Sequence, residues 1–150
     1  MIPAKPSPER LDLLLSQVDD KCELSDILSE AISFEADCLR LVCHAIPPQC
    51  SQDAELVFNF KRDRPTRDAA GVALGRCWTV LKKDYPGKDV DDVSVSAVRA
   101  LICALTLVQA KELGDVVDDL GFFLEMLHHV EPHFEEEESL IRSHFGQYLD

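Results

Sequence analysis

The sequence predicts an all-α fold, a single-domain bundle of about five to seven helices. Apolar residues recur every three or four positions along most of the chain, which is the period of an amphipathic helix. Prolines and helix-capping residues separate these stretches. The length of 150 residues, with 46% hydrophobic and 29% charged residues, fits one globular domain with a sizeable core. We assign residues 7–150 to this domain and expect residues 1–6, which contain two prolines, to form a flexible tail.

The first two predicted helices start at capping residues. Ser7 followed by Pro8 is typical of an N-cap and a first-turn proline. Ser25 can cap a second helix, whose apolar stripe runs from Ile27 to Ala45. Pro47, with a second proline directly after it, ends this helix because proline lacks the amide donor that a helix needs.

Residues 51–62 are ambiguous between helix and strand. Ser51 with Asp53 after it resembles a helix start, whereas Val57 and Phe58 favour strands. We expect a short helix here, with residues 56–61 as a possible short extended segment.

The next predicted helix runs from Arg67 to Lys83 and is capped by Thr66. Gly71 and Gly75 lie four residues apart on one face, where small residues let a second helix approach closely. Proline and glycine at 86–87 terminate this helix.

A helix that starts at Asp91 or Asp92 contains the most apolar stretch, residues 97–110, which is apolar on every face. Such a helix is buried on all sides, either within the domain or at a subunit interface. We expect a homodimer, with three apolar residues near its axis or in a wrapped core: Leu101, Leu105 and Val108. Arg99 should lie at the rim or pair with an acidic residue, and Gly114 should stop the helix.

Two further helices complete the chain. The first carries an apolar stripe from Val116 to Val130, and Pro132 breaks the chain after it. The last helix begins near Phe134, and the glutamates at 135–138 lie near its start, where the helix dipole favours negative charge.

Charge and cysteine content restrict the class of function. The net charge of −13 disfavours nucleic acid as a partner, because phosphate is repelled. One basic loop stands out and is a candidate contact surface, formed by Lys61, Arg62, Arg64 and Arg67. No stretch is apolar and long enough to span a membrane. The six cysteines lack a secretory context and fall partly on apolar helix faces, so we expect free thiols and a cytoplasmic location.

A cluster of histidine and glutamate near the C-terminus is the candidate metal site. On a continuous helix His129, His133 and Glu137 follow one another at intervals of four residues and share one face. Imidazole and carboxylate are suitable ligands for zinc or iron. Only one Glu-x-x-His pair is present, so the chain cannot build the di-iron site of helical bundles.

The sequence contains neither a nucleophile motif nor a glycine-rich phosphate loop. We therefore expect a non-enzymatic, acidic protein-binding module, a regulator of the adaptor, chaperone or anti-activator type that acts through a helical surface. Its partner is expected to be another protein with a basic or apolar surface. The alternatives are a metal-binding bundle that uses the histidine and glutamate cluster, and a bundle that binds a small apolar ligand.

Overall fold

The computed structural model describes residues 4–150, and within them the chain forms seven α-helices, three short 3₁₀ helices and no strand. The α-helices are α1 (Pro8–Lys21), α2 (Leu24–Arg40), α3 (Ser51–Phe58), α4 (Arg67–Asp84), α5 (Val93–Leu107), α6 (Leu113–Val130) and α7 (Phe134–Phe145). The 3₁₀ helices are η1 (Cys43–Ala45), η2 (Pro48–Cys50) and η3 (Gly146–Tyr148). The all-α prediction is confirmed, at the upper end of the expected number of helices.

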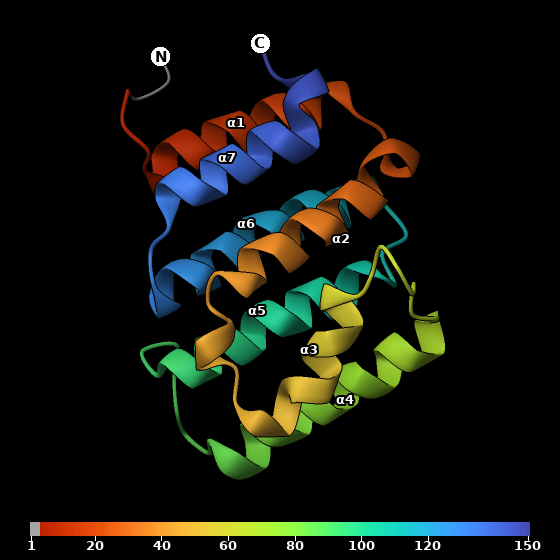
Figure 1. Cartoon of the computed structure of the whole chain (residues 1–150), viewed down its shortest axis with the longest axis vertical. Helices are drawn as coiled ribbons and strands as arrows, with labels where there is room; N and C mark the ends of the chain where they lie inside the picture. The colour runs from red at the N-terminus through yellow and green to blue at the C-terminus, as the bar shows by residue number, and fades with distance from the viewer. Residues whose placement is uncertain (1–3) are drawn as a thin grey trace.

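The helices stack in layers along the longest axis of the molecule (Figure 1). Helices α1 and α7 lie side by side at one end, followed by α2 with α6, then α5, and finally α4 at the opposite end with α3 beside it. Helix α5 packs on α6, α4 and α2, whereas α4 packs mainly on α5. Helix α4 is therefore an outer layer with an uncovered face.

The apolar helix α5 is wrapped by the chain itself. Leu101 and Leu105 are completely buried, and Val108, just after the helix, retains only 8% exposure. These residues belong to the wrapped core, which was one of the two predicted positions. We expected a second subunit to cover part of α5. Instead α2, α4 and α6 of the same chain pack against it and bury its apolar residues.

Several helix starts follow the predicted caps. Ser7 accepts a hydrogen bond from the backbone N–H of Arg10, and Thr66 accepts one from that of Ala69. Asp92 caps α5 through the backbone N–H groups of Ser94 and Val95, so the second of the two proposed starts is the correct one. Short polar side chains at these positions satisfy amide groups that have no partner within the helix.

Other predicted boundaries are wrong. Helix α2 starts at Leu24 after extended residues, so Ser25 lies within its first turn, and its α-helical part ends at Arg40 rather than Ala45. Gly114 lies inside α6 because α5 already ends at Leu107. A glycine that ends a helix usually adopts a positive φ. Among residues 4–150 only Gly87 does so, at +72°, which means that Gly114 does not act as a helix stop.

The possible extended segment at 56–61 is also wrong, and the short helix is confirmed. Helix α3 continues to Phe58 and is followed by a turn in which the Phe60 N–H bonds to the Val57 carbonyl. A strand here would need a second strand to pair with, and the described part of the chain contains none. The backbone N–H and C=O groups of this segment therefore form helical hydrogen bonds.

None of the helices in residues 4–150 combines the length and the hydropathy that crossing a bilayer requires. The predicted tail at 1–6 lies partly outside the described residues, and residues 4–6 precede α1 without regular structure.

Candidate functional site

The uncovered side of α4 contributes one wall of a cavity of about 530 Å³, which we call the Trp78 pocket. Four of its lining residues recur at helical spacing on α4: Trp78, Leu81, Lys82 and Tyr85. Positions three, four and seven residues apart share one face of a helix, so local helix formation alone aligns this wall. The opposite wall comes from α5 through Val95 and Arg99, again four residues apart.

A tight turn closes the end of the Trp78 pocket between α4 and α5. Gly87 adopts the left-handed conformation, and the backbone N–H of Lys88 bonds to the Tyr85 carbonyl at 3.2 Å. A side chain at 87 would be strained at this positive φ, so glycine allows the reversal. Both Tyr85 and Lys88, at either side of this turn, line the pocket.

Three positive charges surround this apolar pocket: Lys82, Lys88 and Arg99. The Cζ atom of Arg99 lies 6.0 Å from the centre of the Trp78 ring, at the outer limit of a cation–π contact. Its Nε atom is buried without a hydrogen-bond partner. Among residues 4–150 none of the three cations forms an ion pair. Of the two predicted positions for Arg99, at a rim or paired with an acid, the ion pair is not formed, and Arg99 is half-buried at the edge of the core.

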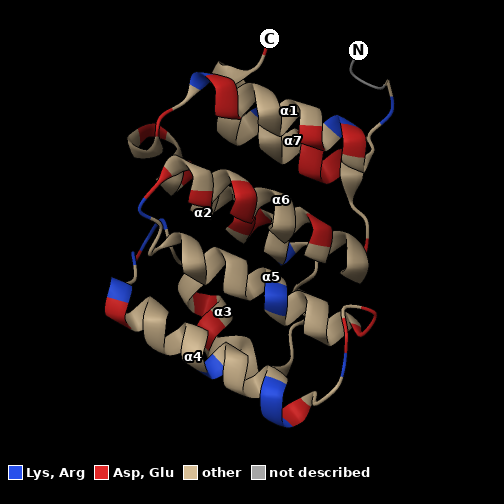
Figure 2. Ribbon diagram, turned by 180° about the vertical axis from the view of Figure 1, so that it is seen from behind, with Lys and Arg blue, Asp and Glu red and all other residues tan. Residues whose placement is uncertain are grey.

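Trp78 is the only tryptophan of the chain and is 50% exposed. Figure 2, which colours charged residues, shows mostly uncharged ribbon along α4, with charges at both ends and one positive segment in the middle. The sequence predicted this helix, but its pattern did not single out Trp78 as a site residue. The sequence does contain one indication of this site. Trp78, a large aromatic residue, follows the buried Cys77 and falls on the side of the helix where a polar residue is usual.

The small-residue face of α4 does not receive another helix as predicted. A Cβ atom added at Gly75 would meet nothing within 4 Å. At Gly71 it would meet the side-chain Nε2 of Gln109 at 3.0 Å. This amide donates a hydrogen bond to the Arg67 carbonyl, so a side chain from the turn after α5 occupies the space.

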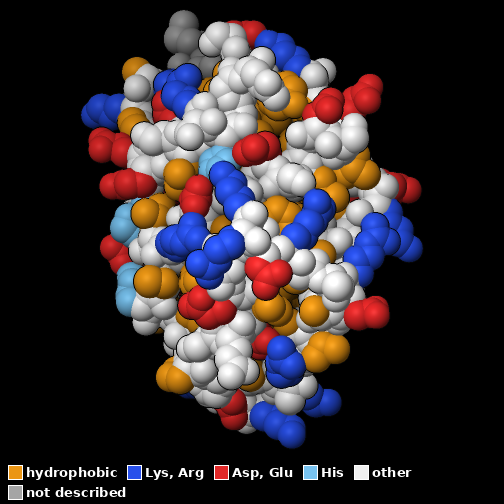
Figure 3. Space-filling model, turned by 45° about the vertical axis from the view of Figure 1, so that its right-hand side comes forward, with side chains coloured by type: hydrophobic (Ala, Val, Ile, Leu, Met, Phe, Trp, Pro, Cys, Tyr) orange, Lys and Arg blue, Asp and Glu red, His pale blue; other side chains and the backbone are white. Residues whose placement is uncertain are grey.

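The basic contact loop lies on the surface, with Lys61, Arg62 and Arg64 in the turn after α3 and Arg67 at the start of α4. All four are exposed. The Cζ atom of Arg64 lies 5.1 Å from the Phe60 ring centre, which directs part of the loop's charge onto the protein's own surface. In the space-filling view, Lys and Arg side chains gather in the middle of one face with carboxylates among them (Figure 3).

The proposed metal ligands are not brought together. Helix α6 ends at Val130 and α7 begins at Phe134, so the continuous helix that would align His129, His133 and Glu137 is broken. Pro132 lies in this break and prevents an uninterrupted helix. Within residues 4–150 no group of three or more His, Cys, Asp or Glu side chains is placed to hold a metal ion.

Glu137 instead has a structural role that the sequence did not indicate. Its buried carboxylate lies 2.7 Å from Nε2 of His128 and accepts a 3.2 Å hydrogen bond from the backbone N–H of His133. The carboxylate therefore connects the last turn of α6 to the start of α7 and satisfies an amide at the helix terminus.

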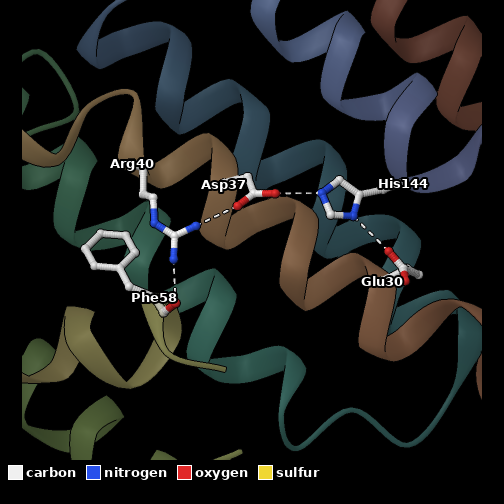
Figure 4. Close-up of polar contacts among 5 residues, drawn as sticks. All are labelled: Glu30, Asp37, Arg40, Phe58 and His144. Atoms are coloured by element: carbon white, nitrogen blue, oxygen red, sulfur yellow. Dashed lines mark hydrogen bonds and ion pairs between the residues drawn. The ribbon is translucent and has the colours of Figure 1, made fainter. Parts of the chain in front are cut away.

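His144 belongs to a second polar network, drawn in Figure 4. Its Nδ1 lies 2.8 Å from a Glu30 oxygen, and its Nε2 lies 2.8 Å from an Asp37 oxygen. Asp37 also accepts a 2.6 Å hydrogen bond from Arg40, whose guanidinium lies 5.3 Å from the Phe58 ring centre. This chain of contacts joins α7, α2 and the end of α3, and it offers no open coordination or reaction site because both ring nitrogens are engaged.

A buried carboxyl pair lies between α2 and α6. Glu35 is completely buried, and neither of its oxygens has a hydrogen-bond partner among the described residues. Burial and the nearby charge of Asp119 raise the pKa of Glu35 well above its usual range. Burial likewise raises the pKa of Asp119 to about 7. Glu35 therefore lies within the packing between α2 and α6 and does not reach water.

Asp119 also lines a cavity of about 490 Å³ together with two other aspartates, Asp115 and Asp118. The remaining lining residues include no cation and no histidine. A proton shared between two carboxyl groups is the arrangement that such a pair favours. The residues that line this cavity therefore include no basic side chain that could work with the carboxyl groups in acid–base catalysis.

The comparisons with known proteins add no assignment: the chain matches no family model, no curated protein and no solved structure.

Proposed function

We propose that this protein is a non-enzymatic binding module, a regulator of the adaptor, chaperone or anti-activator type, which holds a segment of another protein in the Trp78 pocket. The single observation that carries this proposal is the half-exposed Trp78 beside a cavity of about 530 Å³. Tryptophan, like tyrosine and arginine, is enriched among the residues that contribute most to protein–protein binding. A cavity of this volume also falls within the range of about 300–1,000 Å³ that is typical of ligand sites.

The remainder of the surface supports a protein partner rather than nucleic acid. The net charge of −13 repels phosphate and attracts basic segments of a partner to the acidic helices. All six cysteines are free, and only Cys43 is exposed. Free thiols suit a reducing compartment, so we place this function in the cytoplasm.

Affinity capture with three baits tests the proposal: the wild-type chain, Trp78→Ala and Phe122→Ala. Phe122 is a matched control because it is an exposed aromatic on α6, outside the Trp78 pocket. We expect mass spectrometry to identify a protein that the wild type and Phe122→Ala retain and that Trp78→Ala loses. Retention of the same proteins by all three baits would contradict the proposal.

A second copy of this chain is another occupant that the pocket could accept. The expected homodimer relied on incomplete cover of α5, and the protein's own helices supply that cover. The face around Trp78, where a large apolar side chain is half exposed, is the surface on which we test for a second copy. Light scattering over a dilution series distinguishes the cases, since a mass near 16.8 kDa throughout excludes a stable second copy. A mass that doubles in the wild type but not in Trp78→Ala would identify the second copy as the occupant.

A further inference from the structure

We propose that the Trp78 pocket recognises a carboxylate that lies next to an apolar side chain, so that the docking segment of the partner is a short acidic and apolar peptide. This inference rests on the proposed function and adds the chemistry of the ligand. The juxtaposition that carries it is a guanidinium without an ion pair, Arg99, beside the Trp78 ring in a pocket that Tyr85 also lines.

Arg99 has no carboxylate partner among the described residues, and the same holds for Arg62, Arg64 and Arg67 of the basic contact loop. Those three are exposed, whereas Arg99 is half-buried and lines a pocket. Arg10 and Arg142 pair with Glu138, Arg40 pairs with Asp37, and Arg76 pairs with Asp53. The chain has 28 acidic residues against 15 basic ones, so acidic partners are abundant. An arginine left unpaired at a pocket in such a chain is available to an external anion.

The local geometry favours a carboxylate as that anion. The Nε of Arg99 is buried and has no hydrogen-bond acceptor. Because this atom is inaccessible from the pocket, a ligand oxygen would instead meet the other N–H groups of the guanidinium, which form no ion pair among the described residues. The planar guanidinium presents paired N–H groups that match the two oxygens of a carboxylate. Lys82 and Lys88 at the same pocket add charge for a second acidic residue.

The walls of the pocket select an apolar neighbour of the carboxylate. Trp78, Leu81 and Val95 line the cavity with aromatic and aliphatic surface. Removal of an apolar side chain from water between these walls contributes roughly 25 cal/mol per Å². A free anion such as phosphate would leave this surface exposed to water, so the combination of charge and apolar surface indicates a peptide side-chain pair.

The acidic surface elsewhere adds selectivity. The net charge of −13 repels acidic segments in general, whereas the lining of the Trp78 pocket carries three cations and no carboxylate. A segment is retained when its carboxylate reaches Arg99 and its apolar side chain reaches the Trp78 ring at the same time. Binding of this kind weakens with salt, because the surface charges are screened over about 10 Å at 0.1 M ionic strength.

Trp78 makes a direct test possible because a chain with one tryptophan gives one indole N–H signal in a ¹⁵N NMR spectrum. We propose to titrate the labelled protein with two peptides, acetyl-Asp-Leu-Phe-Glu-amide and its neutral counterpart acetyl-Asn-Leu-Phe-Gln-amide. The acidic peptide should shift the indole signal and bind about tenfold more tightly than the neutral one. Equal binding of the two peptides, or no shift with the acidic peptide at millimolar concentration, would overturn carboxylate recognition.

Variants assign the preference to its source. Arg99→Gln should reduce the acidic preference to about twofold, and Arg99→Lys should restore part of it. Lys111→Gln is the matched control, since it removes an exposed positive charge that does not line the pocket, and it should keep the full preference. Lys88→Gln, in an exposed turn, is a second variant that should weaken the preference without affecting the fold.

The outcome for this inference and for the proposed function can be separated. If Trp78→Ala loses its partner in the capture experiment but both peptides bind alike, the binding function stands and carboxylate recognition is wrong. If the partner set is unchanged by Trp78→Ala, the proposed function is wrong whichever peptide binds. An unchanged acidic preference in Arg99→Gln and Lys88→Gln, with circular dichroism identical to the wild type, would also overturn the inference.

Discussion

At the scale of single residues, the buried pair Glu35 and Asp119 makes stability depend on pH. Both pKa values are raised in the folded protein, mainly by burial. A carboxyl group with a raised folded pKa contributes stability that is fully present below its unfolded pKa and is lost as the pH rises through the folded value. For Asp119 this loss extends from about pH 4 to its folded pKa of about 7.

Replacement of Glu35 by glutamine keeps the shape but removes one ionisable group. We expect Glu35→Gln to raise the free energy of unfolding by on the order of 2 kcal/mol at pH 8, with little change at pH 4. Urea denaturation at both pH values measures the difference. Glu125→Gln, which removes an exposed carboxylate of α6, is the control and should show no such pH dependence. A Glu35→Gln variant that is less stable than the wild type at pH 8 would mean that the ionised carboxylate is stabilising.

The cysteines give a second prediction at this scale. Cys43 is the one exposed thiol, and the other five are buried. Burial raises the pKa values of the Cys38 and Cys103 thiols, which lowers the fraction of reactive thiolate. Titration with an aromatic disulfide reagent should detect one fast thiol in the native protein and six after denaturation without reductant. Four or fewer thiols after denaturation would indicate disulfides, and several fast native thiols would indicate a more open fold.

At the scale of elements, α5 organises the bundle. It contacts α2, α4 and α6, and its only charged residue, Arg99, points to the Trp78 pocket. Its length and apolar character therefore serve both the core and one wall of the candidate site. This dual use connects the stability of α5 to the geometry of the pocket.

Truncation of core leucines on α5 tests this arrangement. Leu101→Ala and Leu105→Ala should each lower the free energy of unfolding by about 2–5 kcal/mol, since both side chains are completely buried. Leu13→Ala is the control, because Leu13 of α1 is exposed and should cost well under 1 kcal/mol, as is typical of surface positions (~0.5 kcal/mol). Denaturant unfolding with an unchanged mass by light scattering checks the result. A loss of dimer, rather than of stability, would place these leucines at a subunit interface.

At the scale of the whole molecule, the net charge of −13 opposes compaction. Some of this charge is paired between layers, as where the Arg10 Nε lies 2.6 Å from a Glu138 oxygen and joins α1 to α7. This partner lowers the pKa of Glu138. Its contribution to stability is present above the unfolded pKa and is lost as the pH falls through the folded value.

Self-repulsion predicts a response to salt. We expect an increase of NaCl from about 0.01 M to about 0.15 M to raise Tm at pH 7.5, because screening reduces repulsion among the excess carboxylates. The increase should shrink near pH 5, where carboxylates begin to take up protons. Scanning calorimetry at both pH values measures the effect. A Tm that falls with salt at pH 7.5 would mean that the ion pairs outweigh the repulsion.

The sequence by itself determined the helices, because their signals are local. Helical periodicity, the caps Ser7, Thr66 and Asp92, and the break at Pro132 each depend on residues within a few positions of one another. Boundaries that depended on a single residue type, such as Ser25 and Gly114, were wrong, because neighbouring backbone conformations decided them.

Only the tertiary structure decided which helix faces are covered and which side chains meet. Glu35 and Asp119 are 84 positions apart in the numbering, yet the packing of α2 on α6 joins them and shifts their pKa values. Trp78 and Arg99 lie on different helices, and the reversal at Gly87 brings them to one pocket. Periodicity indicates the apolar side of each helix, but the layer order sets how many of its sides are covered. That order left the Trp78 side of α4 open while it buried most of α5, including Leu101 and Leu105.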